Sequence, residues 1–85
     1  MKSQFQILII EDEEVLSRLY KKALSADGHS VETAVDGEKG LAKLGASEPD
    51  LILLDIMMPK VNGMEVLQKL KGDQETQHIP IVILT

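Results

Sequence analysis

Residues 51–63 read LILLDIMMPKVNG, an apolar run that ends in one carboxylate, Asp55, before two methionines and a proline. A short, continuous run of leucine and isoleucine is typical of a strand that is buried on both faces of a parallel sheet. A charged side chain at the end of such a strand needs a chemical reason, because an unpaired buried charge is costly. The role of Asp55 is therefore the question that this stretch raises.

Three other apolar runs predict further strands. Phe5–Ile10 and Ile81–Leu84, like Leu51–Leu54, are rich in isoleucine, leucine and valine, and we expect all three to be buried on both faces. Ser30–Ala34 is a weaker run, which is typical of a strand nearer the edge of a sheet.

Three segments with helical apolar spacing lie between these runs, and each is bounded by a glycine or a glycine-containing turn. The helical positions are Val15, Leu16, Leu19, Ala23 and Leu24, then Leu41 and Leu44, then Met64, Val66, Leu67 and Leu70. Strands that alternate with helices predict right-handed crossovers and a doubly wound α/β fold with a parallel sheet.

Composition limits the chain to one small domain, residues 1–85, with 44% hydrophobic and 27% charged residues. A net charge of −5 argues against direct contact with nucleic acid, because the phosphate backbone would be repelled. No apolar run approaches the ~20 residues of a membrane span, and the N-terminus runs into acids, not into a signal-peptide cleavage site. Because the chain also has no cysteine, we expect a cytoplasmic protein.

Polar side chains follow three of the predicted strands. Ligands of open parallel sheets bind outside the carboxyl ends of the strands. Glu11 and Asp12 come after the first run, Asp55 after the third and Thr85 after the last. We therefore expect three carboxylates and one hydroxyl to converge on one edge of the sheet.

Clustered carboxylates raise one another's pKa unless a cation joins them. Mg²⁺ prefers oxygen ligands and commonly binds through one or two carboxylates, waters and a phosphate. With a metal present, Asp55 can attack phosphorus as a nucleophile and form an aspartyl-phosphate. The Thr85 hydroxyl can then hydrogen-bond a phosphoryl oxygen.

Other polar residues have simpler interpretations. Glu13 and Glu14 are expected to be acids that stabilise the start of the first helix. Gly63 is interpreted as a backbone requirement. His29 and His78 are expected in solvated loops, without the partners that a metal site needs. The side chains of Met57, Met58 and Met64 are interpreted as adaptable core filler.

The acid pair in ILIIED, the LILLDIMMP segment with Gly63 four residues after Pro59, and the final IVILT together resemble the receiver domain of two-component response regulators. The resemblance implies a flavodoxin-like fold with strand order 2-1-3-4. It implies phosphoryl transfer to Asp55 from a histidine kinase or a phosphotransfer protein. It further implies that Glu11, Asp12 and Asp55 hold Mg²⁺ with the backbone carbonyl of Met57, and that Thr85 contacts the phosphoryl group as a switch residue.

The family pattern continues past this threonine with a fourth helix, a fifth strand that ends in an active-site lysine, and a fifth helix. This sequence contains none of them, so we expect a receiver domain that is truncated after the fourth strand. The spacing of Lys60 does not make it a substitute for that lysine. An exposed Ile81–Leu84 edge and an uncovered sheet face would favour self-association.

Three functions remain open at this point. The first is a phosphoacceptor signalling domain that is not an enzyme. The second is a phosphatase of the haloacid-dehalogenase type, but such enzymes need a second aspartate two residues after the nucleophile, where this chain has Met57. The third is a truncated or engineered fragment that self-associates and cannot be phosphorylated.

Overall fold

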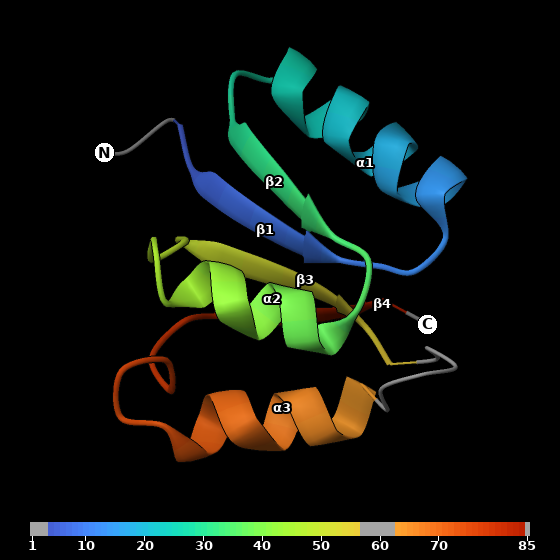
Figure 1. The fold of residues 1–85 in the computed structure, drawn as a ribbon. Helices are drawn as coiled ribbons and strands as arrows, with labels where there is room; N and C mark the ends of the chain where they lie inside the picture. The colour runs from blue at the N-terminus through green and yellow to red at the C-terminus, as the bar shows by residue number, and fades with distance from the viewer. Residues whose placement is uncertain (1–3, 57–62, 85) are drawn as a thin grey trace.

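The computed structural model describes residues 4–56 and 63–84. Strands and helices alternate along the chain (Figure 1), in the order β1 (Gln6–Ile10), α1 (Glu14–Ala26), β2 (Ser30–Ala34), α2 (Gly37–Leu44), β3 (Leu51–Asp55), α3 (Gly63–Gly72) and β4 (Ile81–Leu84). The predicted elements are confirmed, with two corrections at their ends. The first strand begins at Gln6, one residue later than predicted, and the third strand includes Asp55.

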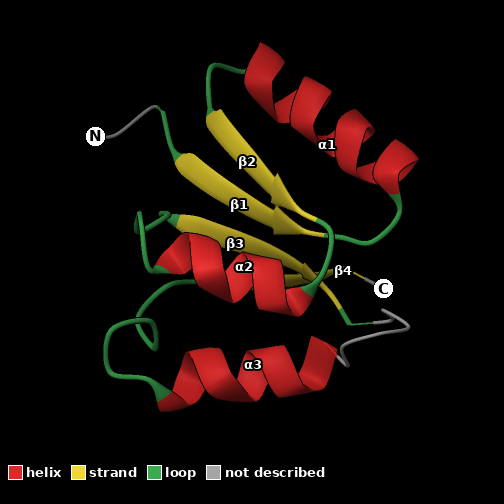
Figure 2. Ribbon diagram, in the orientation of Figure 1, coloured by secondary structure: helices red, strands yellow, loops and turns green. Residues whose placement is uncertain are grey.

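The four strands form one parallel sheet in the order β2-β1-β3-β4, which is the order that the resemblance implied. In the centre, Ile7 of β1 pairs with Val31 of β2 on one side and with Leu51 of β3 on the other. The arrowheads of β1, β2 and β3 lie at the same edge of the sheet (Figure 2). Side chains that follow β1 and β3 are therefore brought to one place.

Helices cover both faces of the sheet, which is the predicted doubly wound arrangement (Figure 1). Successive side chains of a strand point to opposite faces. Ile7 and Ile9 therefore pack in the core beneath α1, whereas Leu8 and Ile10 pack in the core beneath α2 and α3. All four side chains are buried, so β1 is covered on both faces as predicted.

The fourth strand is less buried than predicted. Val82 is 47% exposed and Ile83 is 38% exposed, while Ile81 and Leu84 are half-buried. Burial on both faces was the wrong prediction for this strand, because Val82 and Ile83 point to opposite faces and both are more than one-third exposed. In the described part of the sheet, β3 is the only strand beside β4. β4 is therefore an edge strand of the described sheet. The expectation of self-association depends on such an edge.

Apolar side chains also face solvent on two helices. Val15 is 72% exposed and Leu19 is 58% exposed on α1, whereas Tyr20 of the same helix packs against the sheet. Met64, at the start of α3, is 45% exposed, so its interpretation as core filler was wrong. Met57 and Met58 lie outside the described residues. No helix in residues 4–56 and 63–84 has the length and hydropathy to cross a membrane.

Candidate functional site

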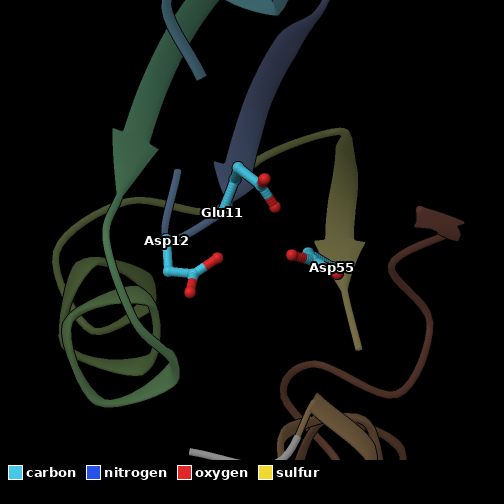
Figure 3. Close-up of side chains that lie close together, drawn as sticks. All are labelled: Glu11, Asp12 and Asp55. Carbon is cyan, nitrogen blue, oxygen red and sulfur yellow. The ribbon is translucent and has the colours of Figure 1, made fainter. Parts of the chain in front are cut away.

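Three acidic side chains meet at the carboxyl ends of the two central strands. Glu11 and Asp12 directly follow β1, and Asp55 is the last residue of β3. Figure 3 shows the three side chains directed toward a shared space between the strand ends. One carboxylate oxygen from each residue lies within 4.8 Å of those of the other two. The three carboxylates thus converge where the strand order places them, and their roles as metal ligands and phosphoacceptor stay predictions.

The other two predicted site residues, Met57 and Thr85, lie outside the described residues. The structure does place the neighbour of Thr85, because Leu84 pairs with Asp55 in the ladder between β4 and β3.

Backbone contacts fix the two strand ends that carry the acids. The backbone N–H of Glu11 donates to the carbonyl oxygen of Ala34 at 3.0 Å, which extends the pairing of β1 with β2 by one residue. On the other side, α3 begins directly against the end of β3. A Cβ atom on Gly63 would lie 2.2 Å from the Cα atom of Ile56 and 2.7 Å from the carbonyl oxygen of Asp55. The interpretation of Gly63 as a backbone requirement is confirmed, because no side chain fits there.

Burial is the main cause of the raised pKa in the acid site. Glu11 is only 3% exposed and Asp55 is 8% exposed. Burial, more than any other cause, raises the pKa of Glu11 to about 8, and the hydrogen bond to Asp55 and the charges of Asp55, Asp12 and Glu13 raise it further in the same direction. At neutral pH and without a cation, Glu11 therefore carries a proton that it donates to Asp55.

The acids open into a hollow of about 280 Å³ at the surface. Its lining residues are Glu11, Asp12, Glu13, Leu16, Tyr20, Asp55 and Leu84. A hollow with three carboxylate ligands and room for waters or an anion suits a hard divalent cation, and the residues present fit Mg²⁺.

Glu13 also lines this hollow. Its interpretation as an acid that stabilises the start of the helix did not predict this position. It occupies the N-cap position of α1, but its side chain makes no capping hydrogen bond. Glu14 does match the prediction, since it lies in the first turn of α1 and pairs with Arg18 at 2.7 Å. The only signal for Glu13 in the sequence was its position in the EDEE run, directly after a strand end.

The two histidines lie near the amino ends of the strands, before β2 and β4. His29 accepts a hydrogen bond from the backbone N–H of Phe5 through Nδ1 at 3.1 Å, and exposed His78 pairs with Glu48. In the described ranges, Glu11, Asp12 and Asp55 form the one group of three or more possible metal ligands. The histidines take no part in it.

Comparison with known proteins decides the family. The family model described as "Response regulator receiver domain" matches residues 7–85 of the chain. The chain belongs to this family. Receiver domains are signalling domains of two-component systems, so the fold and family that the acid pair and the LILLDIMMP segment predicted are confirmed.

Individual relatives of this receiver domain agree with the family match. It is 45% identical to the response regulator PleD of Caulobacter vibrioides over 80 residues, which are 94% of this chain and 18% of PleD. This chain therefore spans less than a fifth of that relative.

Two solved structures resemble the receiver domain closely. The N-terminal domain of a response regulator receiver protein from Methanoculleus marisnigri JR1 superposes with a TM-score of 0.92 at 38% identity, over 95% of this chain and 66% of that one. The Mn²⁺-bound form of the response regulator Rcp1 superposes with a TM-score of 0.86 at 34% identity, over 95% of this chain and 65% of that one.

Proposed function

We propose that this receiver domain accepts a phosphoryl group on Asp55 from the phosphohistidine of a histidine kinase or a phosphotransfer protein, with Mg²⁺ as its cofactor. The observation that carries the proposal is the meeting of Glu11, Asp12 and Asp55 within 4.8 Å of one another at the ends of adjacent strands. Buried acids this close together repel one another unless a proton or a cation joins them.

The cation would be held by carboxylate oxygens of Glu11, Asp12 and Asp55, with the backbone carbonyl of Met57 as the further ligand that the family resemblance implies. When bound, Mg²⁺ neutralises negative charge on the transferring phosphoryl group. The similar structure of Rcp1 in its Mn²⁺-bound form supports a divalent cation in this fold. The proton on Glu11 must leave before that carboxylate can act as a ligand.

In the transfer, a carboxylate oxygen of Asp55 attacks phosphorus in line with the leaving imidazole. The oxygen–phosphorus bond forms as the nitrogen–phosphorus bond breaks, and the donor histidine keeps the electron pair. Thr85 is proposed to hydrogen-bond a phosphoryl oxygen of the product and to act as the switch residue. The apolar side chains of Leu16 and Leu84 line the hollow in which the phosphoryl group would lie.

The proposal is tested by incubating the chain with acetyl phosphate and Mg²⁺ and measuring intact mass. One phosphoryl adduct is expected, and Asp55→Ala should abolish it. Asp36→Asn is the matched control, because Asp36 follows β2 at the same sheet edge but its side chain accepts from the backbone N–H of Lys39 at 2.8 Å. Absence of an adduct in the unchanged chain, or an adduct that survives Asp55→Ala, would reject the proposal and favour a receiver fragment that cannot be phosphorylated.

We further propose that the chain acts as a signalling component and not as an enzyme with its own substrate turnover. Its partner is the phosphodonor protein, and its net charge of −5 disfavours direct binding to nucleic acid. The absence of cysteine from the sequence is compatible with a cytoplasmic location.

A second candidate property is self-association through β4. The observation that favours it is the exposed edge strand, in which Val82 and Ile83 are 47% and 38% exposed and carry no charge that would repel another strand. The free backbone groups of an apolar edge strand can pair with the edge of a second copy.

A further inference from the structure

Glu13 lines the hollow of the acid site although it is positioned to cap a helix. It is the N-cap residue of α1, where a side-chain oxygen would ordinarily accept from a backbone N–H of the first turn. Its side chain makes no such hydrogen bond. Instead, Glu13 lines the hollow of Glu11 and Asp55.

The next residue provides an internal comparison. Glu14 has the same charge and chemistry, but it is absent from the lining of the hollow and its carboxylate lies 2.7 Å from the guanidinium of Arg18. Two adjacent glutamates therefore have different surroundings, one beside the acid site and the other neutralised by a partner on the surface of α1.

Glu13 is too far from the acid trio to be a fourth direct ligand of the same ion, because the group of mutually close ligand atoms contains only Glu11, Asp12 and Asp55 within the described residues. Its side chain is exposed. A carboxylate in this position would act on a bound cation through space and through the waters that a hydrated Mg²⁺ keeps.

We propose that Glu13 is an outer positioning residue of the site, which strengthens the binding of a divalent cation at Glu11, Asp12 and Asp55 without coordinating it. The proposal rests on the proposed function of these three acids as a cation site. In the EDEE run, Glu11 and Asp12 would then be direct ligands, Glu13 the outer carboxylate and Glu14 a residue of the helix surface.

The test is a Mg²⁺ titration of the full chain and of Glu13→Gln and Glu14→Gln, followed by backbone amide NMR shifts around residues 11–13 and 55. Both variants remove one negative charge, so net charge is matched. At low salt, Glu13→Gln should weaken Mg²⁺ binding about fivefold and Glu14→Gln less than about twofold, since charge interactions fall with distance and with neutralisation by a partner. Glu13→Asp, which keeps the charge, should restore most of the affinity.

The difference between the two variants should shrink at about 0.5 M KCl, because salt screens an interaction between exposed charges. Equal effects of Glu13→Gln and Glu14→Gln would overturn the role of Glu13 while leaving the acid site intact. Failure of the unchanged chain to bind Mg²⁺ would overturn both the cation site and the role of Glu13. The acetyl phosphate experiment reports on Asp55 separately, so the two proposals fail in distinguishable ways.

Discussion

Glu11 is held in a protonated state by its own surroundings, and this makes the stability of the metal-free chain depend on pH. Its pKa in the folded chain is about 8, against 4.5 for a free glutamate side chain. Between these values the folded state binds a proton that the unfolded state has lost, so the free energy of unfolding decreases as pH rises. The stabilisation is complete below pH 4.5 and is lost as pH rises through about 8.

We therefore expect urea denaturation, followed by circular dichroism without divalent cations, to show a lower free energy of unfolding at pH 8.5 than at pH 5.5. Glu11→Gln should flatten this difference, because an amide keeps hydrogen-bonding capacity but does not titrate. Added Mg²⁺ should restore stability to the unchanged chain at pH 8.5, since it binds the folded state. An equal pH dependence in Glu11→Gln would show that other groups cause it.

Gly63 is a second residue whose surroundings restrict which amino acid fits there. An added Cβ atom would meet backbone atoms of Asp55 and Ile56, which cannot move aside as a flexible side chain can. We expect Gly63→Ala to lower the free energy of unfolding by about 1–3 kcal/mol, the usual cost of overpacking. Gly72→Ala is the control at the other end of α3, because nothing lies within 4 Å of its added Cβ atom. Urea denaturation should find this control neutral or slightly stabilising, and equal costs in the two variants would contradict the steric explanation.

At the scale of elements, the turn between α3 and β4 is fastened to the rest of the molecule. His78 pairs with Glu48, which lies in the loop before β3. Within the turn, the Thr76 hydroxyl donates to the carbonyl oxygen of Leu70 at 2.7 Å. The backbone N–H of Ile79 donates to the carbonyl oxygen of Thr76 at 3.0 Å, and the Ile79 side chain is buried. These contacts set the start of β4 beside β3.

The ion pair should contribute little by itself, because the side chains of His78 and Glu48 are 60% and 59% exposed. A double-mutant cycle with His78→Gln and Glu48→Gln should give a coupling free energy of about 0.2–1 kcal/mol at low salt, and less at about 0.5 M KCl, because salt screens exposed charges. Glu75 lines one surface hollow together with Glu48 and His78. As the control, Glu75→Gln should not couple to His78→Gln. A coupling that is unchanged between the two salt concentrations would contradict the assignment as an ion pair.

The ends of elements were the most informative part of the sequence. Glu11, Asp12 and Asp55 could be predicted to converge because each follows or ends an aliphatic run, and parallel strands bring such ends to one edge. The exposure of Val82 and of Met64 could not be predicted in the same way, since hydropathy patterns do not show which neighbours cover an element. Glu13 was missed because a glutamate at a helix start looks the same in sequence whether or not it caps the helix.

At the scale of the whole molecule, the edge strand β4 and the helix α1 both carry exposed apolar side chains. Val82 and Ile83 of β4, together with Val15 and Leu19 of α1, are all more than one-third exposed. Exposed apolar side chains on an edge strand are associated with pairing between copies. Multi-angle light scattering of the chain should therefore detect dimers or larger species as concentration rises.

Val82→Lys should shift this equilibrium toward the monomer, because a charged side chain on an edge strand opposes pairing. Lys22→Ala, a change at an exposed position of α1, is the control and should not shift it. A monodisperse monomer of the unchanged chain at high concentration would reject self-association.

Gly63 brings the start of α3 into close contact with the end of β3. The first residue of α3 lies so close to the backbone of Asp55 and Ile56 that no side chain fits between them. We therefore expect a displacement of the Asp55 backbone to shift the start of α3 as well.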